Sequence, residues 1–194
     1  MKAKLVFSLL TLGSLANANI GTYGFKGFPS SYFVETGTFS GDGVRKALEA
    51  GCFKKVFSID VDLNGVRDCQ RKFSRNKNVT IVHGNSRTDL WDIIKDLDGT
   101  ITFWLDAHIY PPVTDGRQNA PLLEELEQIK RHPIKTHTIL IDDLSCCGTL
   151  SFDYVTLEDL INKIKEINPD YTIKLLDGGN DDEVINNILY AYIK

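Results

Sequence analysis

Acidic side chains end apolar segments at two points in the second half of the chain. Asp106 follows TITFWL, and the pair Asp142 and Asp143 follows THTILI. If both segments are strands of one sheet, their ends bring three carboxylates together, which is costly unless a cation neutralises them or one is protonated. Oxygen ligands with open coordination positions suit Mg²⁺ better than Zn²⁺. These residues predict a divalent-metal site, although an acid at a strand end also serves as a helix cap or turn residue.

Three glycines lie close together in VETGTFSGDG, residues 34–43. Gly37, Gly41 and Gly43 lack a Cβ atom, so the backbone can turn sharply there and approach a ligand closely. The spacing G-x-x-x-G-x-G does not match the dinucleotide fingerprint G-x-G-x-x-G, and no Gly-Lys-Ser/Thr follows as in a P-loop. The segment therefore predicts a ligand-binding loop of another kind.

The segments around these residues alternate between strand-like and helical patterns. The expected strands are 32–36, 55–61, 78–84, 100–108 and 136–144, and the expected helices are 43–50, 63–74, 86–97, 120–132 and 157–168. Two further strand-like runs within 171–194 predict a terminal hairpin. The sequence thus predicts one α/β domain, residues 19–194, with a Rossmann-like open doubly wound sheet of seven strands, mostly parallel with an antiparallel C-terminal hairpin strand.

The pattern E-x-G-x-x-x-G-x-G, from Glu35 to Gly43, resembles motif I of the class I S-adenosylmethionine-dependent methyltransferases. The resemblance extends over residues 32–193 through the strand pattern, the terminal hairpin and Asp60 at the end of the second strand. It implies S-adenosylmethionine (SAM) as the cofactor, with Asp60 accepting hydrogen bonds from both ribose hydroxyls. Asp62 competes for that role, and its alternative is a helix N-cap. The residues that the resemblance assigns to the cofactor are Glu35, Gly37, Gly41, Gly43, Asp60, Asn85 and Ser86.

Within this superfamily, the acids at the next strand ends resemble those of metal-dependent O-methyltransferases of the catechol and macrocin types. The resemblance implies that Asp106, Asp142 and Asp143 hold Mg²⁺, which grips the acceptor oxygens and lowers the pKa of the attacking hydroxyl. His108 is the candidate general base beside Asp106, because its ordinary pKa lies near neutrality. Catechol-type enzymes carry a lysine three residues after the acid, where this chain has Ile109. The implied activity is O-methylation of a small molecule.

The charge balance limits the class of partner. The 194 residues contain 22 Lys plus Arg and 26 Asp plus Glu, without a basic stripe, which argues against a nucleic-acid partner. The four cysteines do not have the spacing of a metal site and are expected as free thiols. A small-molecule methyl acceptor is the expected partner, and the sequence leaves its identity and the oligomeric state open.

The N-terminus has the pattern of a secretory signal. MKAK is followed by an apolar run and by Ala16-Asn17-Ala18, which fits a small-x-small cleavage site, and the run is too short to span a bilayer. Residues 1–18 therefore predict a signal peptide and a secreted or periplasmic protein without a membrane span, whereas an N-terminal helix or strand packed on the domain would leave it cytoplasmic. An exported chain also raises an alternative function, a non-catalytic binding module that retains the methyltransferase scaffold.

One irregular segment completes the predicted site. The stretch from Tyr110 to Asn119 contains two prolines and a glycine, and it follows Asp106 at the same edge of the predicted sheet. It is either a lid over the acceptor, with Arg117 reading an anionic group, or a solvated connection.

Overall fold

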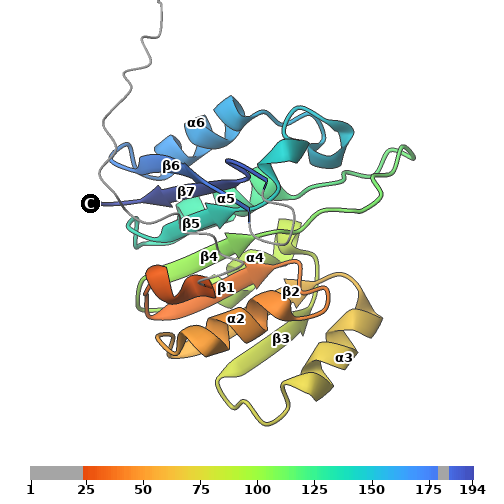
Figure 1. The fold of residues 1–194 in the computed structure, drawn as a ribbon, viewed down its shortest axis with the longest axis vertical. Coiled ribbons are helices and arrows are strands. Elements are labelled where there is room, and N and C mark those ends of the chain that lie inside the picture. Colours follow the sequence, from red (N-terminus) through yellow and green to blue (C-terminus); the bar gives the residue numbers. More distant parts are fainter. Residues whose placement is uncertain (1–23, 179–183) are drawn as a thin grey trace, which may run out of the picture.

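A computed structural model describes residues 24–178 and 184–194 as an α/β domain around one sheet (Figure 1). The seven strands lie in the order β3-β2-β1-β4-β5-β7-β6. They are β1 (Tyr32–Thr36), β2 (Lys55–Asp60), β3 (Val79–His83), β4 (Ile101–Leu105), β5 (Thr138–Ile141), β6 (Thr172–Leu176) and β7 (Ile188–Tyr192). The predicted Rossmann-like sheet is confirmed, because β1 to β5 pair in parallel while β7 lies antiparallel between β5 and β6.

Helices connect the strands and cover both faces of the sheet. They are α2 (Asp42–Ala50), α3 (Leu63–Lys72), α4 (Ser86–Ile94), α5 (Leu122–Arg131) and α6 (Leu157–Ile167), with short 3-10 turns η1 (Gly24–Gly27), η2 (Leu144–Cys146) and η3 (Leu150–Phe152). One apolar core joins η1, α2 and α3 to one face, and the other joins α4, α5 and α6 to the opposite face. All five residues of β4 are buried, as expected for a central strand with helices on both sides.

Local sequence signals set the helix ends. Thr156 and Asp159 form a reciprocal capping box at the start of α6, and Asp62 caps α3 by accepting hydrogen bonds from the amides of Asn64 and Gly65. Gly51 ends α2 with a left-handed φ of 67°. The alternative reading of Asp62 as an N-cap is therefore what the structure has.

Two sequence features lie outside the described residues. The signal-like segment 1–18 precedes Gly24, and residues 179–183 fall within the connection between β6 and β7. In the described part of the chain, no helix has both the length and the apolar composition needed to cross a membrane.

A buried histidine pair ties β4 and β5 together at the sheet edge opposite their carboxyl ends. His137 Nδ1 accepts a hydrogen bond from the amide of Ile101, so its Nε2 carries the proton and donates to His132 Nδ1 at 3.0 Å. His132 Nε2 in turn donates to the carbonyl of Leu97. Burial lowers the pKa of His137 to about 3, with His132 and Lys135 acting in the same direction. His137 is thus uncharged at neutral pH.

This pair predicts a loss of stability in acid. Between pH 6.5 and 3 the unfolded chain binds a proton at position 137 that the folded chain does not, so the free energy of unfolding falls as the pH is lowered through that window. From pH 7 to pH 5 the contribution of His137 is about 2 kcal/mol. The free energy of unfolding, measured with urea at pH 7 and at pH 5, should therefore fall by about 2 kcal/mol less in His137→Gln than in the unmodified protein. If the difference in unfolding free energy between the two proteins is the same at both pH values, the assignment is wrong.

Candidate functional site

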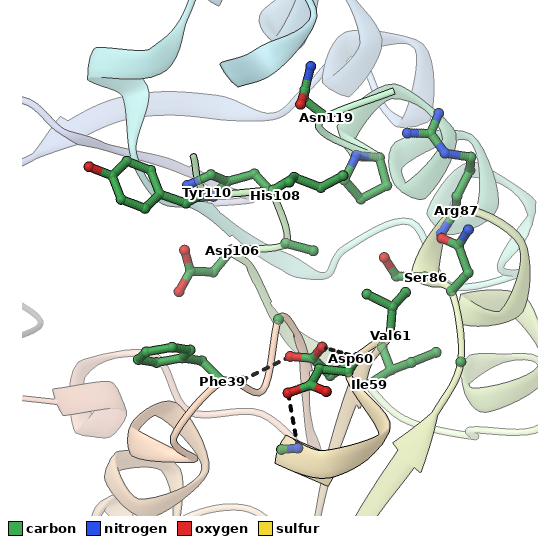
Figure 2. A pocket seen from close by; sticks show the side chains of 18 of the residues that line it. Phe39, Ile59, Asp60, Val61, Ser86, Arg87, Asp106, His108, Tyr110 and Asn119 are labelled. Atoms are coloured by element: carbon green, nitrogen blue, oxygen red, sulfur yellow. Dashed lines mark hydrogen bonds between the residues drawn. The ribbon is translucent and has the colours of Figure 1, made fainter. Parts of the chain in front are cut away.

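A cleft of about 710 Å³ opens at the carboxyl ends of β1 to β4 (Figure 2). The strand order reverses here, because the chain moves outward from β1 to β3 and then returns to place β4 on the other side of β1. Ligands of doubly wound sheets bind at such a reversal, and the volume is in the range of small-molecule sites. The cleft is therefore the candidate site, and its walls come from the loops after these four strands.

Gly37 forms the floor of the cleft after β1. It has a φ of +85°, and a Cβ atom at this position would lie 2.8 Å from the carbonyl oxygen of Asp106. Its amide donates to the carbonyl of Ile59, and the amide of Asp106 donates to that of Thr36. A side chain at Gly37 would therefore force the ends of β1 and β4 apart.

Asp60 ends β2 and lines the cleft beside Gly37. Its Oδ2 accepts a hydrogen bond from the amide of Phe39 at 2.9 Å, and its Oδ1 accepts one from the amide of Asp62 at 2.8 Å. These two contacts fix the carboxylate, and each oxygen retains a lone pair that can accept another hydrogen bond. The loop after β1 and the end of β2 thus hold a preoriented acceptor at the cleft.

Asn85 and Ser86 form the next wall, at the start of α4. Asn85 caps this helix, since its side chain accepts from the amide of Arg87 and its own amide donates to Asp89. Arg87 also lines the cleft, but its guanidinium is held by Glu124 at 2.5 Å and by the carbonyl of Ala120. Among the described residues that line the cleft, Arg87 is the only arginine, and it is already paired.

The structure places Glu35, Gly41 and Gly43 behind the loop instead of in the cleft lining. A Cβ at Gly43 would lie 1.7 Å from the Glu35 carboxyl, and a Cβ at Gly41 would lie 2.7 Å from the ring of Phe73. These two glycines therefore make room for the protein's own side chains. Glu35 is buried and accepts a hydrogen bond from Ser58 at 2.5 Å. Burial raises its pKa to about 8, against the effect of that hydrogen bond.

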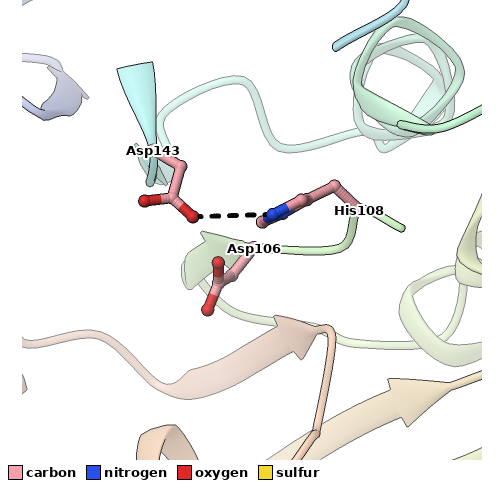
Figure 3. A group of neighbouring side chains, drawn as sticks. All are labelled: Asp106, His108 and Asp143. Atoms are coloured by element: carbon pink, nitrogen blue, oxygen red, sulfur yellow. Dashed lines mark ion pairs between the residues drawn. The ribbon is translucent and has the colours of Figure 1, made fainter. Parts of the chain in front are cut away.

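The predicted metal ligands lie at the ends of β4 and β5, but the group that converges differs from the expected one (Figure 3). Ligand atoms of Asp106, His108 and Asp143 all lie within 4.8 Å of one another. Asp142 is not in this group, and its Oδ1 accepts a hydrogen bond from the amide of Asp143. Burial raises the pKa of Asp106 well above its ordinary value, and the negative charges of Asp142 and Asp143 add to the shift. The structure thus adds His108 to the candidate ligands and turns Asp142 aside.

Several solved structures with the same arrangement of elements are described as methyltransferases, and another is described as a spermidine synthase. SMU.1697c from Streptococcus mutans, described as a methyltransferase in complex with SAH, matches with a TM-score of 0.60 and 16% identity over 87% of this chain and 92% of its own. The N-methyltransferase NodS from Bradyrhizobium japonicum matches with a TM-score of 0.55 and 12% identity over 88% of this chain and 90% of its own. A Staphylococcus aureus protein described as a caffeoyl-CoA O-methyltransferase matches with a TM-score of 0.55 and 13% identity over 88% and 78%. No family model and no curated protein match the sequence.

The chain has the class I methyltransferase fold.

Sequence reasoning missed one residue that shapes the end of the cleft where the predicted metal ligands lie. Asn187, at the start of β7, is buried; its side chain accepts a hydrogen bond from the amide of Ser145 and donates to Asp143 Oδ1 at 3.3 Å. Its backbone carbonyl accepts from the amide of Leu144. These contacts support Asp143, which has an unusual φ of +56°. No sequence spacing signals this contact, because Asn187 precedes β7 and Asp143 follows β5, 44 residues away along the chain.

A second missed contact anchors the irregular loop after β4. Asn119 is buried and donates to the Asp153 carboxylate through its backbone amide and its side chain. Its side-chain oxygen accepts from the amide of Val113, and its carbonyl accepts from the amide of Ile109. In this methyltransferase fold the loop is thus held at its base, and its Tyr110 lines the cleft. Arg117, expected to read an anion, is paired with Asp115 at 2.8 Å.

The raised pKa of Glu35 predicts how one substitution changes with pH. The folded chain keeps the Glu35 proton up to about pH 8, so the stability contributed by that proton is full at low pH and is lost as the pH rises through 8. Glu35→Gln removes this titration. Between pH 5 and pH 8 its free energy of unfolding should therefore rise by about 3 kcal/mol relative to that of the unmodified protein. Denaturant unfolding checks it, with the exposed Glu49→Gln on α2 as the matched control. If the free energy of unfolding of Glu35→Gln depends on pH in the same way as that of the control, the assignment is wrong.

Proposed function

We propose that this chain is a SAM-dependent methyltransferase that methylates a hydroxyl of a small molecule with the help of a divalent ion. The observation that carries the proposal is the Asp60 carboxylate, fixed by two backbone amides, beside the Gly37 backbone at the strand-order reversal. The neighbour in complex with SAH supports the same cofactor class for this fold.

The cofactor half of the cleft offers a complementary set of groups. Asp60 is placed to accept hydrogen bonds from two adjacent ribose hydroxyls, which needs two carboxylate oxygens. The Gly37 backbone lines the cleft where the amino-acid part of SAM would pass. Asn85 and Ser86 provide polar atoms on the opposite wall for the adenine edge. Asp62, capping α3, lines the same wall and does not need to contact the ligand.

The charge of the lining favours a cationic cofactor and an acceptor that is not a polyanion. Several aspartates line the cleft. Arg87 is the one lysine or arginine among the described lining residues, and it is paired with Glu124. A sulfonium cation is attracted to such a surface, whereas a phosphate backbone is repelled by it. This supports a small-molecule acceptor.

The acceptor half contains donor groups that fit a divalent ion. Asp106 and Asp143 approach His108, and no lysine or arginine in the described part of the chain pairs with either carboxylate. An ion bound there would hold acceptor oxygens and lower the pKa of the hydroxyl. The chain's own contribution is alignment, because these residues lie next to the cofactor half through the Gly37–Asp106 contact. Transfer moves the methyl from sulfur to oxygen, breaks the carbon–sulfur bond and releases the hydroxyl proton.

Substitution of Asp60 tests the cofactor assignment. Asp60→Asn removes the charge and one acceptor oxygen, so S-adenosylhomocysteine should bind at least about tenfold more weakly, since hydrogen bonds to a charged group contribute about 1.5–3 kcal/mol each. Titration calorimetry measures the affinity. Asp68→Asn is the matched control, because Asp68 lines the same cleft from α3 and is not expected to reach the ribose.

Two results would count against the proposal. If the unmodified protein does not bind S-adenosylhomocysteine, the cofactor assignment fails altogether. If Asp60→Asn binds it as tightly as Asp68→Asn does, the ribose contact is not at Asp60. Equal thermal-unfolding midpoints of the two variants without ligand would show that lost affinity is not lost folding.

A further inference from the structure

We infer that Asp106, His108 and Asp143 form a mixed nitrogen and oxygen metal site that prefers a first-row transition ion to Mg²⁺, with His108 as a ligand. The inference rests on the proposed function, because it names the ion at the acceptor end of that cleft. It differs from the sequence expectation in two respects: Asp142 is outside the ligand set, and His108 binds the ion instead of acting as the general base.

The distances suit a shared ion better than a direct contact. His108 Nε2 and Asp143 Oδ2 are 3.8 Å apart, which is too long for a hydrogen bond. Two ligand atoms about 2.1 Å from one ion can lie at most about 4.2 Å apart. The His108–Asp143 distance is below that upper limit, and the ligand atoms of all three residues lie within 4.8 Å of one another.

The three side chains reach the site from rigid positions on two adjacent strand ends. Asp106 directly follows β4, His108 lies two residues further on, and Asp143 is held after β5 by Asn187. The His108 ring packs edge-on against Phe152, with ring centroids 5.9 Å apart. Figure 3 shows the imidazole turned toward the Asp143 carboxylate, with Asp106 beside them. The ring is thus positioned by packing and strand geometry.

The electrostatic balance leaves room for a positive charge. Asp106 and Asp143 lie together, and His108 is the one basic side chain that forms an ion pair with either of them in residues 24–178 and 184–194. A single imidazolium would leave at least one carboxylate uncompensated, which is unfavourable for partly buried acids. A dication held by Asp106 and Asp143 balances both charges and allows His108 to bind as neutral imidazole.

The donor types decide which ion is preferred. Carboxylates alone serve Mg²⁺, whereas imidazole nitrogen favours first-row transition ions, whose affinities also rise along the Irving–Williams order. The three converging side chains supply three ligands, and the remaining positions stay open to acceptor oxygens. An imidazole nitrogen that binds an ion has no lone pair left to accept the hydroxyl proton.

The test compares two ions in His108→Ala and in a matched control, in protein freed of any histidine tag. Calorimetry should give at least tenfold tighter binding of Co²⁺ than of Mg²⁺ to the unmodified protein. His108→Ala should weaken Co²⁺ at least tenfold while changing Mg²⁺ by less than threefold. Pulsed electron paramagnetic resonance of bound Mn²⁺ should show ¹⁴N coupling that disappears in the variant. His83→Ala, an exposed histidine at the end of β3, should retain both the affinity and the coupling.

The outcomes separate this inference from the proposed function. Unchanged Co²⁺ affinity in His108→Ala, persistent ¹⁴N coupling, or equal Co²⁺ and Mg²⁺ affinities in the unmodified protein would each overturn the inference. Absence of any divalent binding would overturn this inference together with the divalent ion of the proposed function. The SAM-dependent activity is tested separately, because it fails only if the unmodified protein does not bind S-adenosylhomocysteine. Unchanged S-adenosylhomocysteine affinity in His108→Ala confirms that the variant is folded, and His108→Gln provides a second variant of similar volume.

Discussion

The cleft depends on the close approach of two backbones where β1 and β4 end. With 2.8 Å between the position of a Gly37 Cβ and the carbonyl oxygen of Asp106, no side chain fits between them. This contact joins the loop that faces the proposed cofactor half to the residue that begins the proposed acceptor half. Of the three glycines in the loop, Gly37 alone faces the cleft, because it alone lies at this junction. The two halves of the site are therefore fixed relative to each other by the main chain.

Negative charge is concentrated around this junction and is only partly compensated. Burial raises the pKa of Glu35 to about 8 and that of Glu125 to about 7, so both carboxyls behind the cleft hold their protons readily. Asp60 and Asp106 face the cleft itself. Uncompensated acids destabilise an empty site, and the same acids favour cationic ligands once these are present. The sulfonium of SAM and a divalent ion are two ligands of that charge.

The fold was largely predictable from the sequence, whereas the division of labour among the site residues was not. Each strand and helix has its own apolar period, and Asp60 and Asp106 could be placed at strand ends because a strand's end is a local feature. Whether a glycine faces a ligand or a neighbouring side chain depends on packing across the sheet. Thus Gly43 proved to accommodate Glu35, a contact between residues on different elements that no spacing reveals.

The predicted metal ligands show more clearly that sequence alone does not settle how side chains are directed. Asp142 and Asp143 are adjacent in sequence, so the sequence treats them alike, yet the left-handed backbone of Asp143 directs their side chains differently. Asn187 helps to fix that backbone from a strand far along the chain. Long-range support of this kind is decided by tertiary structure and lies beyond any local pattern.

The clasp between Asn119 and Asp153 has a consequence for how this protein can diversify. The hydrogen bonds between Asn119 and Asp153 hold the loop after β4 at its base. Changes in residues 111–118 therefore need not disturb these contacts. Insertions or exchanges there would remodel the rim of the opening and leave the underlying scaffold undisturbed. A loop held in this way allows the selectivity of the site to change while the fold stays the same.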